Sequence, residues 1–179
     1  MKKKWFALLE VFALVIFASG CAPVITATPV AVTETPTDSG AENCYFNWAS
    51  KSLPDLSAQV QDAIRQLQPE AEAIAQAYGE NCTYEDGHST FSAMETDFIV
   101  TLQVNDLKNA DDLGNWIKQT MTVLDRFPPD QTPGPQPGQV TLQFQSGSDQ
   151  LSVAFSISNY QKLSPNLSNA EIYQALSSH

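Results

Sequence analysis

The sequence predicts an α+β domain with the element order αββαββ, in which a four-stranded antiparallel sheet carries two helices on one face. Three observations predict this architecture. One apolar stripe with helical spacing begins at Leu53, a second begins near Ala110, and alternating apolar residues after each stripe indicate strands. The domain is expected over residues 43–160, a length that suits a single hydrophobic core.

The first helix is expected over residues 53–78, because apolar side chains recur there every three or four positions. The stripe consists of Leu53, Leu56, Val60, Ile64, Leu67, Ala71, Ile74 and Tyr78. Ser52 is a suitable cap, Pro54 is tolerated in the first turn, and Gly79 suits the end of the helix. Pro69 interrupts a regular helix, so we expect one kinked helix or two abutting helices. Packing on a sheet is favoured over a coiled coil.

Strands follow this helix. Short strands are expected around residues 82–84 and 90–91, on either side of the turn pair Asp86-Gly87. A longer strand is expected over residues 96–104. Its alternating side chains Phe98, Val100, Leu102 and Val104 share one face.

The second half repeats the helix and strand pattern. A helix is expected over residues 110–127, with Asn109 as its cap and Pro128-Pro129 as its stop. A hairpin follows, with apolar alternation over residues 140–145 and 151–157 and a turn at 147–149. In the C-terminal tail, residues 161–179, the pair Ser168 and Glu171 has the spacing of a capping box and predicts a short last helix.

The first 21 residues have the features of an export signal. Three lysines precede an apolar stretch, residues 5–18, that is broken only by Glu10. Its length suits a signal segment of about 7–15 residues better than a membrane span of about 20. The run Ala18-Ser19-Gly20-Cys21 resembles the lipobox of bacterial lipoproteins, with Ala18 where that family usually has Leu. The alternative is an uncleaved membrane anchor with an incidental cysteine.

The resemblance implies a signal peptide over residues 1–20 and a Cys21 that carries diacylglycerol and palmitate. It also implies that the domain is lipid-anchored on the extracytoplasmic face of the cell membrane, or of an outer membrane if the cell has one. Residues 22–42 are rich in Thr and Pro and are expected to form a disordered linker. The domain resembles the small α+β heads of other bacterial lipoproteins with such spacers, which implies no activity.

Cysteine usage and charge fit this interpretation. Cys44 and Cys82 are an even pair in an oxidising compartment and predict a disulfide; two buried free thiols are the alternative. Closing a loop of about 39 residues stabilises a fold by at most about 4 kcal/mol.

Removing residues 1–20 leaves 6 basic and 19 acidic residues, a net charge of −13. This charge argues against nucleic acid as a partner and against direct docking on anionic lipid.

The sequence contains only weak candidates for chemistry, and no cofactor is expected. His88 has the context of an exposed turn residue. Glu80, Glu85 and Asp86 are weak candidates for a hard cation, as are Asp106, Asp111 and Asp112, although a solvated loop and a helix N-terminus explain both groups. Glu95 and Asp97 are a candidate hydrolytic pair, because alternation places both on the outward face of one strand.

The candidate binding surface is the polar face of the sheet. Short uncharged side chains on this face are suited to an envelope protein or a glycan, although an ordinary solvated face is the simpler interpretation: Thr101, Gln103, Thr141, Gln143 and Gln145. Tyr45, Phe46 and Trp48 are a second candidate patch, with packing under the first helix as the favoured interpretation. We therefore expect a non-enzymatic binding or interaction module. The alternatives are an envelope hydrolase with a carboxylate site and a structural accessory subunit of an envelope complex.

Overall fold

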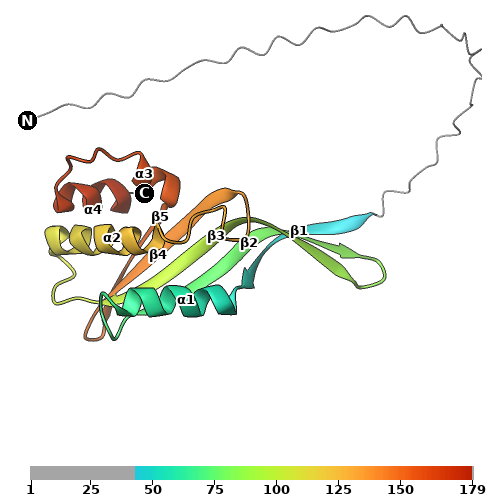
Figure 1. Cartoon of the computed structure of the whole chain (residues 1–179), viewed down its shortest axis with the longest axis horizontal. Helices are drawn as coiled ribbons and strands as arrows, with labels where there is room; N and C mark the ends of the chain where they lie inside the picture. Colours follow the sequence, from blue (N-terminus) through green and yellow to red (C-terminus); the bar gives the residue numbers. More distant parts are fainter. Residues whose placement is uncertain (1–42, 179) are drawn as a thin grey trace, which may run out of the picture. The chain divides into compact units, whose positions relative to one another are not determined.

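The structure is a computed structural model that describes residues 43–178. The expected signal peptide, Cys21 and the expected linker lie outside the described residues. The elements follow the order shown in Figure 1: β1 (Cys44–Ser52), α1 (Pro54–Arg65), β2 (Glu72–Tyr84), β3 (Ser89–Gln103), α2 (Ala110–Leu124), β4 (Gln136–Ser146), β5 (Asp149–Ser156), α3 (Ile157–Gln161) and α4 (Asn169–Ser177).

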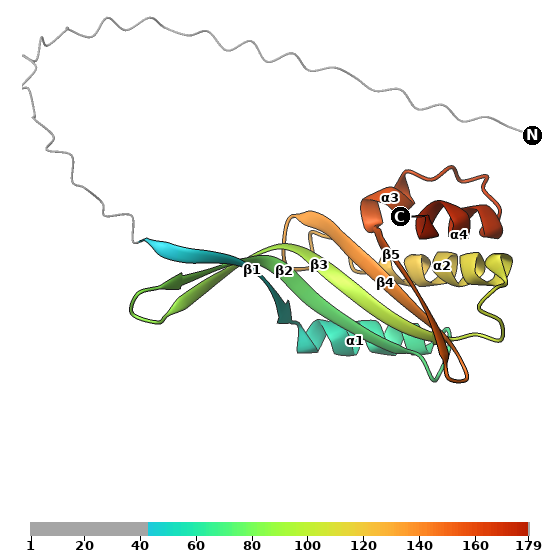
Figure 2. The ribbon, with the colours of Figure 1, turned by 180° about the vertical axis from the view of Figure 1, so that it is seen from behind.

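The α+β class is confirmed, but the sheet differs from the expected one. It has five strands in the order β1-β2-β3-β4-β5. Neighbouring strands are antiparallel except β3 and β4, which are parallel. The expectation of four antiparallel strands is therefore wrong. The physical reason is the connection through α2, since a crossover helix returns the chain to the start of the next strand in the same direction. Figure 2 shows this arrangement from behind.

One face of the sheet is buried in the core. Its alternating side chains include Ala73 and Ala75 of β2, Phe98 and Val100 of β3, and Phe144 of β4. Buried residues of α1, α2 and α4 belong to the same apolar cluster. A β-carbon at Gly114 of α2 would collide with the backbone of Asn169, so glycine permits the close approach of α4. The C-terminal segment is thus part of the folded core, where it contributes Ile172 and Leu176.

The expected helix over residues 53–78 is correct only as far as Arg65. Beyond the turn that contains Pro69, residues 72–84 form β2. Ala71, Ala73, Ala75 and Ala77 are buried in alternation, a period of two that the helical stripe obscured. Tertiary packing overrides the high helix propensity of alanine here, because small side chains let α1 lie close to the strand.

Two expected helix boundaries are also wrong. Ser52 is the last residue of β1, and Leu53 occupies the cap position without a side-chain hydrogen bond. Gly79 does not end a helix but lies within β2, where a β-carbon would collide with the carbonyl of Ser92. It therefore permits close strand approach where the β2–β3 register shifts.

Other local predictions are confirmed. Asn109 caps α2 by accepting a hydrogen bond from the Asp112 amide. The β2–β3 turn contains Gly87 with φ of 86°, and the β4–β5 turn contains Gly147 with φ of 61°. Ser168 and Glu171 form the expected capping box of α4. Ile157, expected at the end of a strand, instead begins α3 after the Ser156 cap.

The edge of β2 beyond the end of β1 is closed by polar side chains of α1. Ser57 Oγ accepts from the Ala75 amide at 2.9 Å and donates to the Ala75 carbonyl at 3.1 Å. Gln61 does the same farther along, accepting from the Ala73 amide and donating to the Ala71 carbonyl, both at 2.7 Å. Two α1 side chains thus occupy backbone groups that a neighbouring strand would otherwise bind.

Candidate functional site

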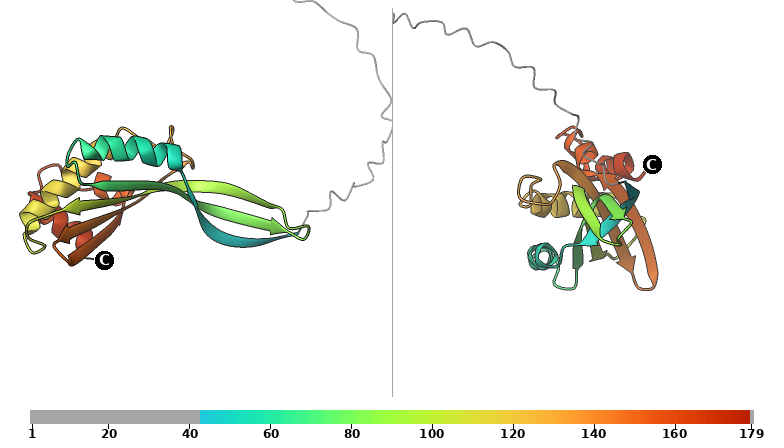
Figure 3. Two further views of the ribbon diagram at one scale, coloured as in Figure 1. Left: turned by 90° about the horizontal axis from the view of Figure 1, so that it is seen from below. Right: turned by 90° about the vertical axis from the view of Figure 1, so that its right-hand side faces the viewer.

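Three strands extend beyond the region where β4 pairs with β3 and form an arm, defined here as residues 44–49, 79–84 and 89–93. The pairing of β4 to β3 begins at Glu95, whereas β1, β2 and β3 remain paired to the far end. The left view of Figure 3 shows the arm extending past the helices. Cys82, 8% exposed, is its single buried hydrophobic side chain. Backbone pairing and covalent linkage therefore hold the arm together, with little help from apolar burial.

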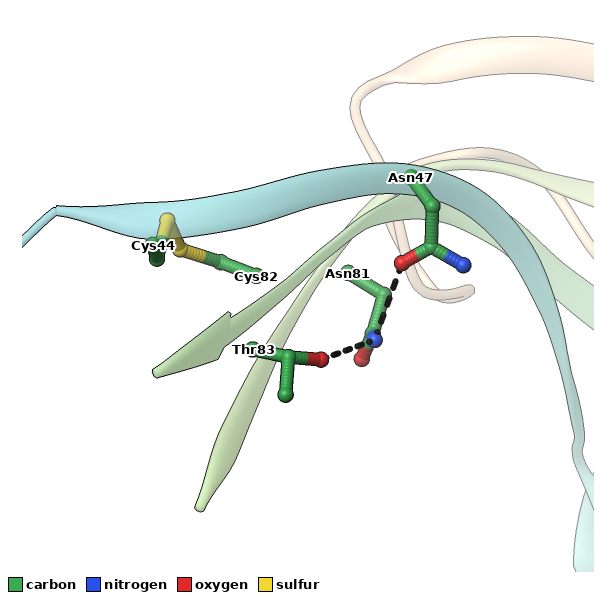
Figure 4. The surroundings of a disulfide bond; sticks show 5 residues. All are labelled: Cys44, Asn47, Asn81, Cys82 and Thr83. Atoms are coloured by element: carbon green, nitrogen blue, oxygen red, sulfur yellow. Dashed lines mark hydrogen bonds between the residues drawn. A yellow bond between two sulfur atoms is a disulfide. The ribbon is translucent and has the colours of Figure 1, made fainter. Parts of the chain in front are cut away.

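A disulfide joins Cys44 at the start of β1 to Cys82 of β2, with 5.5 Å between their Cα atoms. This pairing confirms the expected one. Next to it, the Asn81 side-chain amide donates to Asn47 Oδ1 at 3.1 Å and to Thr83 Oγ1 at 3.3 Å (Figure 4). The disulfide and the asparagine contact both link β1 to β2, so the edge strand is fixed at its exposed end.

The aromatic residues of β1 are the most exposed large hydrophobic side chains described. Tyr45 is 76% exposed, Phe46 61% and Trp48 56%. The favoured expectation, that they pack under the first helix, is wrong. They belong to a strand at the edge of the sheet, and α1 begins only after that strand ends. Strand alternation places Phe46 and Trp48 on one face and Tyr45 on the other.

Phe46 and Trp48 border a shallow depression with an acidic wall. Trp48 lies opposite Glu80 in the strand register and stacks on Tyr78 with a centroid distance of 5.6 Å and an interplanar angle of 13°. Phe46, Asn47, Trp48 and Glu80 line about 280 Å³ of open space. We call Phe46, Trp48, Tyr78 and Glu80 the aromatic patch. It combines aromatic ring faces with the carboxylate of Glu80 on one face of the sheet.

The turn at the tip of the arm holds His88. Its ring stacks on Tyr84 at 4.1 Å, and its Nδ1 contacts Asp86 Oδ1. Hydrogen bonds from the His88 backbone amide and then from its side chain lower the pKa of Asp86. Asn43, Tyr84 and Glu85 complete a shallow hollow with these residues. The expected turn position of His88 is confirmed, and the local contacts explain the orientation of its ring.

The weak metal candidates are not brought together. Glu80 lies within β2 opposite Trp48, whereas Glu85 and Asp86 lie beyond the end of that strand. Asp106, Asp111 and Asp112 lie at the start of α2, where the Asp106 carboxylate accepts from the Lys108 amide. Within residues 43–178, no three His, Cys, Asp or Glu side chains converge as metal ligands would.

The expected polar face does form one continuous surface on β3 and β4. Thr101 lies opposite Gln143 and donates to its Oε1 at 3.2 Å. Gln103 lies opposite Gln145 and donates to its Oε1 at 2.8 Å. Thr141, the fifth candidate, lies opposite Ile99 on the same face. Two of these pairs are thus hydrogen-bonded across the β3–β4 register, whereas Thr141 lies beside the apolar Ile99.

Glu95 and Asp97 lie on the same face of the sheet as these residues, between the aromatic patch and the hydrogen-bonded pairs of the polar face. Burial, and then the nearby charge of Asp97, raise the pKa of Glu95. Burial also raises the pKa of Asp97, although its carboxylate accepts from the Gln139 amide at 2.8 Å, which acts in the opposite direction. The expected shared orientation is therefore accompanied by a pKa that burial raises in both carboxyl groups.

Sequence reasoning offered Tyr45, Phe46 and Trp48 as a candidate patch but missed β1 as a strand, and so missed that Phe46 and Trp48 lie beside Tyr78 and Glu80. The signal was present, because Tyr45, Phe46 and Trp48 are residue types favoured in strands. No helix within the described part of the chain is long and apolar enough to cross a membrane. No protein-family model, curated protein or solved structure matches the chain.

Proposed function

We propose that the chain is a lipid-anchored extracytoplasmic lipoprotein whose domain is a non-enzymatic binding module, with the arm as its interaction surface. The anchor part of the proposal rests on the Ala18-Ser19-Gly20-Cys21 run and its preceding charged and apolar segments. The binding part rests on one structural observation: three large aromatic side chains of an edge strand are exposed, Phe46 and Trp48 on one face and Tyr45 on the other. Aromatic residues are enriched at the centres of protein interfaces, where they give large contact area at low entropic cost.

The anchor is tested by metabolic labelling with an alkyne fatty acid, followed by membrane fractionation. Wild-type protein is expected to carry the label and to remain with the membranes. Cys21→Ser is expected to lose both the label and the membrane association. Cys44→Ser combined with Cys82→Ser provides the matched control, since it removes both other cysteines and leaves Cys21 in place. An unlabelled wild type, or an equally labelled Cys21→Ser variant, contradicts the anchor.

The interaction surface is tested by photo-crosslinking in intact cells. A photoreactive phenylalanine replaces Phe46 in one variant and Thr122, an exposed residue of α2, in the control. We expect a discrete adduct from position 46 and none from position 122. Adducts of equal intensity at the two positions, or none at position 46, contradict the arm as the interaction surface.

A hydrolase with a carboxylate site is the second candidate, and the observation that favours it is the Glu95–Asp97 pair. The two carboxyl groups share one face of β3, and burial raises the pKa of each, which makes them a candidate acid–base pair. Activity toward envelope glycans, lost in both Glu95→Gln and Asp97→Asn but kept in Glu72→Gln, is the expected result of this candidate. Activity that survives both changes eliminates it.

A further inference from the structure

The outer edge of β1 is an exposed edge of the sheet without a covering strand. β1 lies at the end of the sheet and pairs with β2 alone. Where β1 ends, Ser57 and Gln61 of α1 take over the edge of β2. At the opposite end of the sheet, α3 and α4 contact β5. Within the described chain, no hydrogen bond reaches the outward backbone groups of β1.

An open edge of this kind is a template for another extended chain. Folded proteins normally protect their edges with charges, proline or bulges. β1 is nine residues long, contains no proline and has Lys51 as its single charged residue. Its outward N–H and C=O groups are therefore free to bind an incoming strand, while the side chains of β1 and β2 select the sequence of that strand.

The aromatic patch favours a partner with positive charge. Within residues 43–178, the one ion pair joins His88 to Asp86, so the Glu80 carboxylate has no cationic partner there. Lys51 lies 5.5 Å from the Phe91 ring and makes its own cation–π contact. Ring faces beside an unpaired carboxylate attract a cation through the ring quadrupole and the negative charge together. The net charge of −11 adds a long-range attraction of the same sign.

We infer that β1 binds an extended, lysine- or arginine-rich segment of another protein, which adds to the sheet as a strand. One of its cationic side chains lies over Phe46 and Trp48 beside Glu80. This inference rests on the proposed function, because it names the class of partner that the arm binds. A second copy of the chain is the competing occupant, and the negative charge of both copies opposes it.

The experiment uses the full-length protein in a non-ionic detergent and a dye-labelled, capped Lys-Val-Lys-Val-Lys-Val-Lys peptide, with fluorescence anisotropy as the readout. Saturable binding is expected. A Glu-Val peptide of the same pattern is expected not to bind, since its charge is repelled. A Lys-Pro peptide keeps the charge but loses the backbone donors on alternate residues, so it is expected to bind at least about tenfold more weakly.

Matched variants place the site. Glu80→Gln and Trp48→Ala are each expected to lower the affinity for the Lys-Val peptide by about three- to tenfold. Glu72→Gln, an exposed carboxylate of the same strand, and Ile74→Ala, an exposed apolar residue of that strand, are expected to leave binding unchanged. Equal effects of Glu72→Gln and Glu80→Gln indicate non-specific charge attraction and overturn the inference.

Three further outcomes also overturn it. They are the absence of peptide binding, equal binding of the Lys-Pro and Lys-Val peptides, and a dimer of the wild type in light scattering that Trp48→Ala abolishes. The last outcome identifies a second copy as the occupant. If an adduct still forms from position 46 in cells while the peptide does not bind, the proposed function stands and only the cationic-strand inference fails.

Discussion

Phe144 and Phe46 both lie on strands of the same sheet, but the side chain of Phe144 is 0% exposed and that of Phe46 is 61% exposed. Phe144 belongs to the body, defined here as the described domain without the arm, where one face of the sheet is buried against helices. Phe46 belongs to the arm, where three strands continue without that cover. The body is therefore stabilised by burial, whereas the arm is held by strand pairing and a disulfide and keeps its aromatic side chains accessible.

The largest effect is expected when the same substitution, phenylalanine to alanine, is made in the body and in the arm. Phe144→Ala is expected to lower the free energy of unfolding by about 3–5 kcal/mol, because it leaves a cavity in the core. Phe46→Ala is expected to change it by less than about 0.5 kcal/mol, because the side chain is mostly in solvent already. Urea unfolding measures both. Similar losses for the two variants break the distinction between the arm and the body.

Removing the disulfide is expected to have the next largest effect. Cys44→Ser combined with Cys82→Ser releases a link between residues 38 apart and should cost about 2–4 kcal/mol. Hydrogen exchange should rise most in residues 44–49 and 79–84, since the arm has little burial to replace the link. Reduction of the wild type serves as the control and should give the same pattern. Unchanged exchange in the arm contradicts the role given to the disulfide.

A local change in the body should have a smaller effect. Ser168→Ala removes the side chain that accepts from the Glu171 amide and is expected to cost about 1 kcal/mol. Ser148→Ala, in the exposed β4–β5 turn, is the matched control and should be neutral. Thermal unfolding of the two variants is sufficient. Equal melting temperatures contradict a stabilising capping box.

The smallest expected effect is the pH dependence from Glu95 and Asp97, which lie between the two regions. Burial raises the pKa of both carboxyl groups, so the folded state binds their protons more tightly than the unfolded state does. Their contribution therefore favours folding at low pH and is lost as pH rises from about 4 through the folded-state pKa values. Glu95→Gln with Asp97→Asn should flatten the stability profile in this window. Glu72→Gln should not, and an unchanged profile in the double variant contradicts the assignment.

Features set by neighbours in the sequence were easier to predict than those set by contacts between distant segments, in the body and in the arm alike. The cap at Asn109, the turn at Gly147 and the box at Ser168 depend on neighbours within a few residues, so local patterns predicted them. The parallel pairing of β3 and β4 depends on contacts between distant segments. β2 was misread because alanines at 71, 73, 75 and 77 suit a helix locally and a strand only beside α1. The polar face followed from alternation, whereas the aromatic patch required β1 to be recognised as an edge strand.

The position of the disulfide has a mechanical consequence. The chain enters the domain at the distal end of β1, next to Cys44. Tension applied at that end reaches the hydrogen bonds that pair β1 with β2. The link from Cys44 to Cys82 gives the same load a covalent route into β2. A pull on the N-terminal side is therefore shared with a covalent bond, and after chemical reduction the hydrogen bonds of β1 carry it alone.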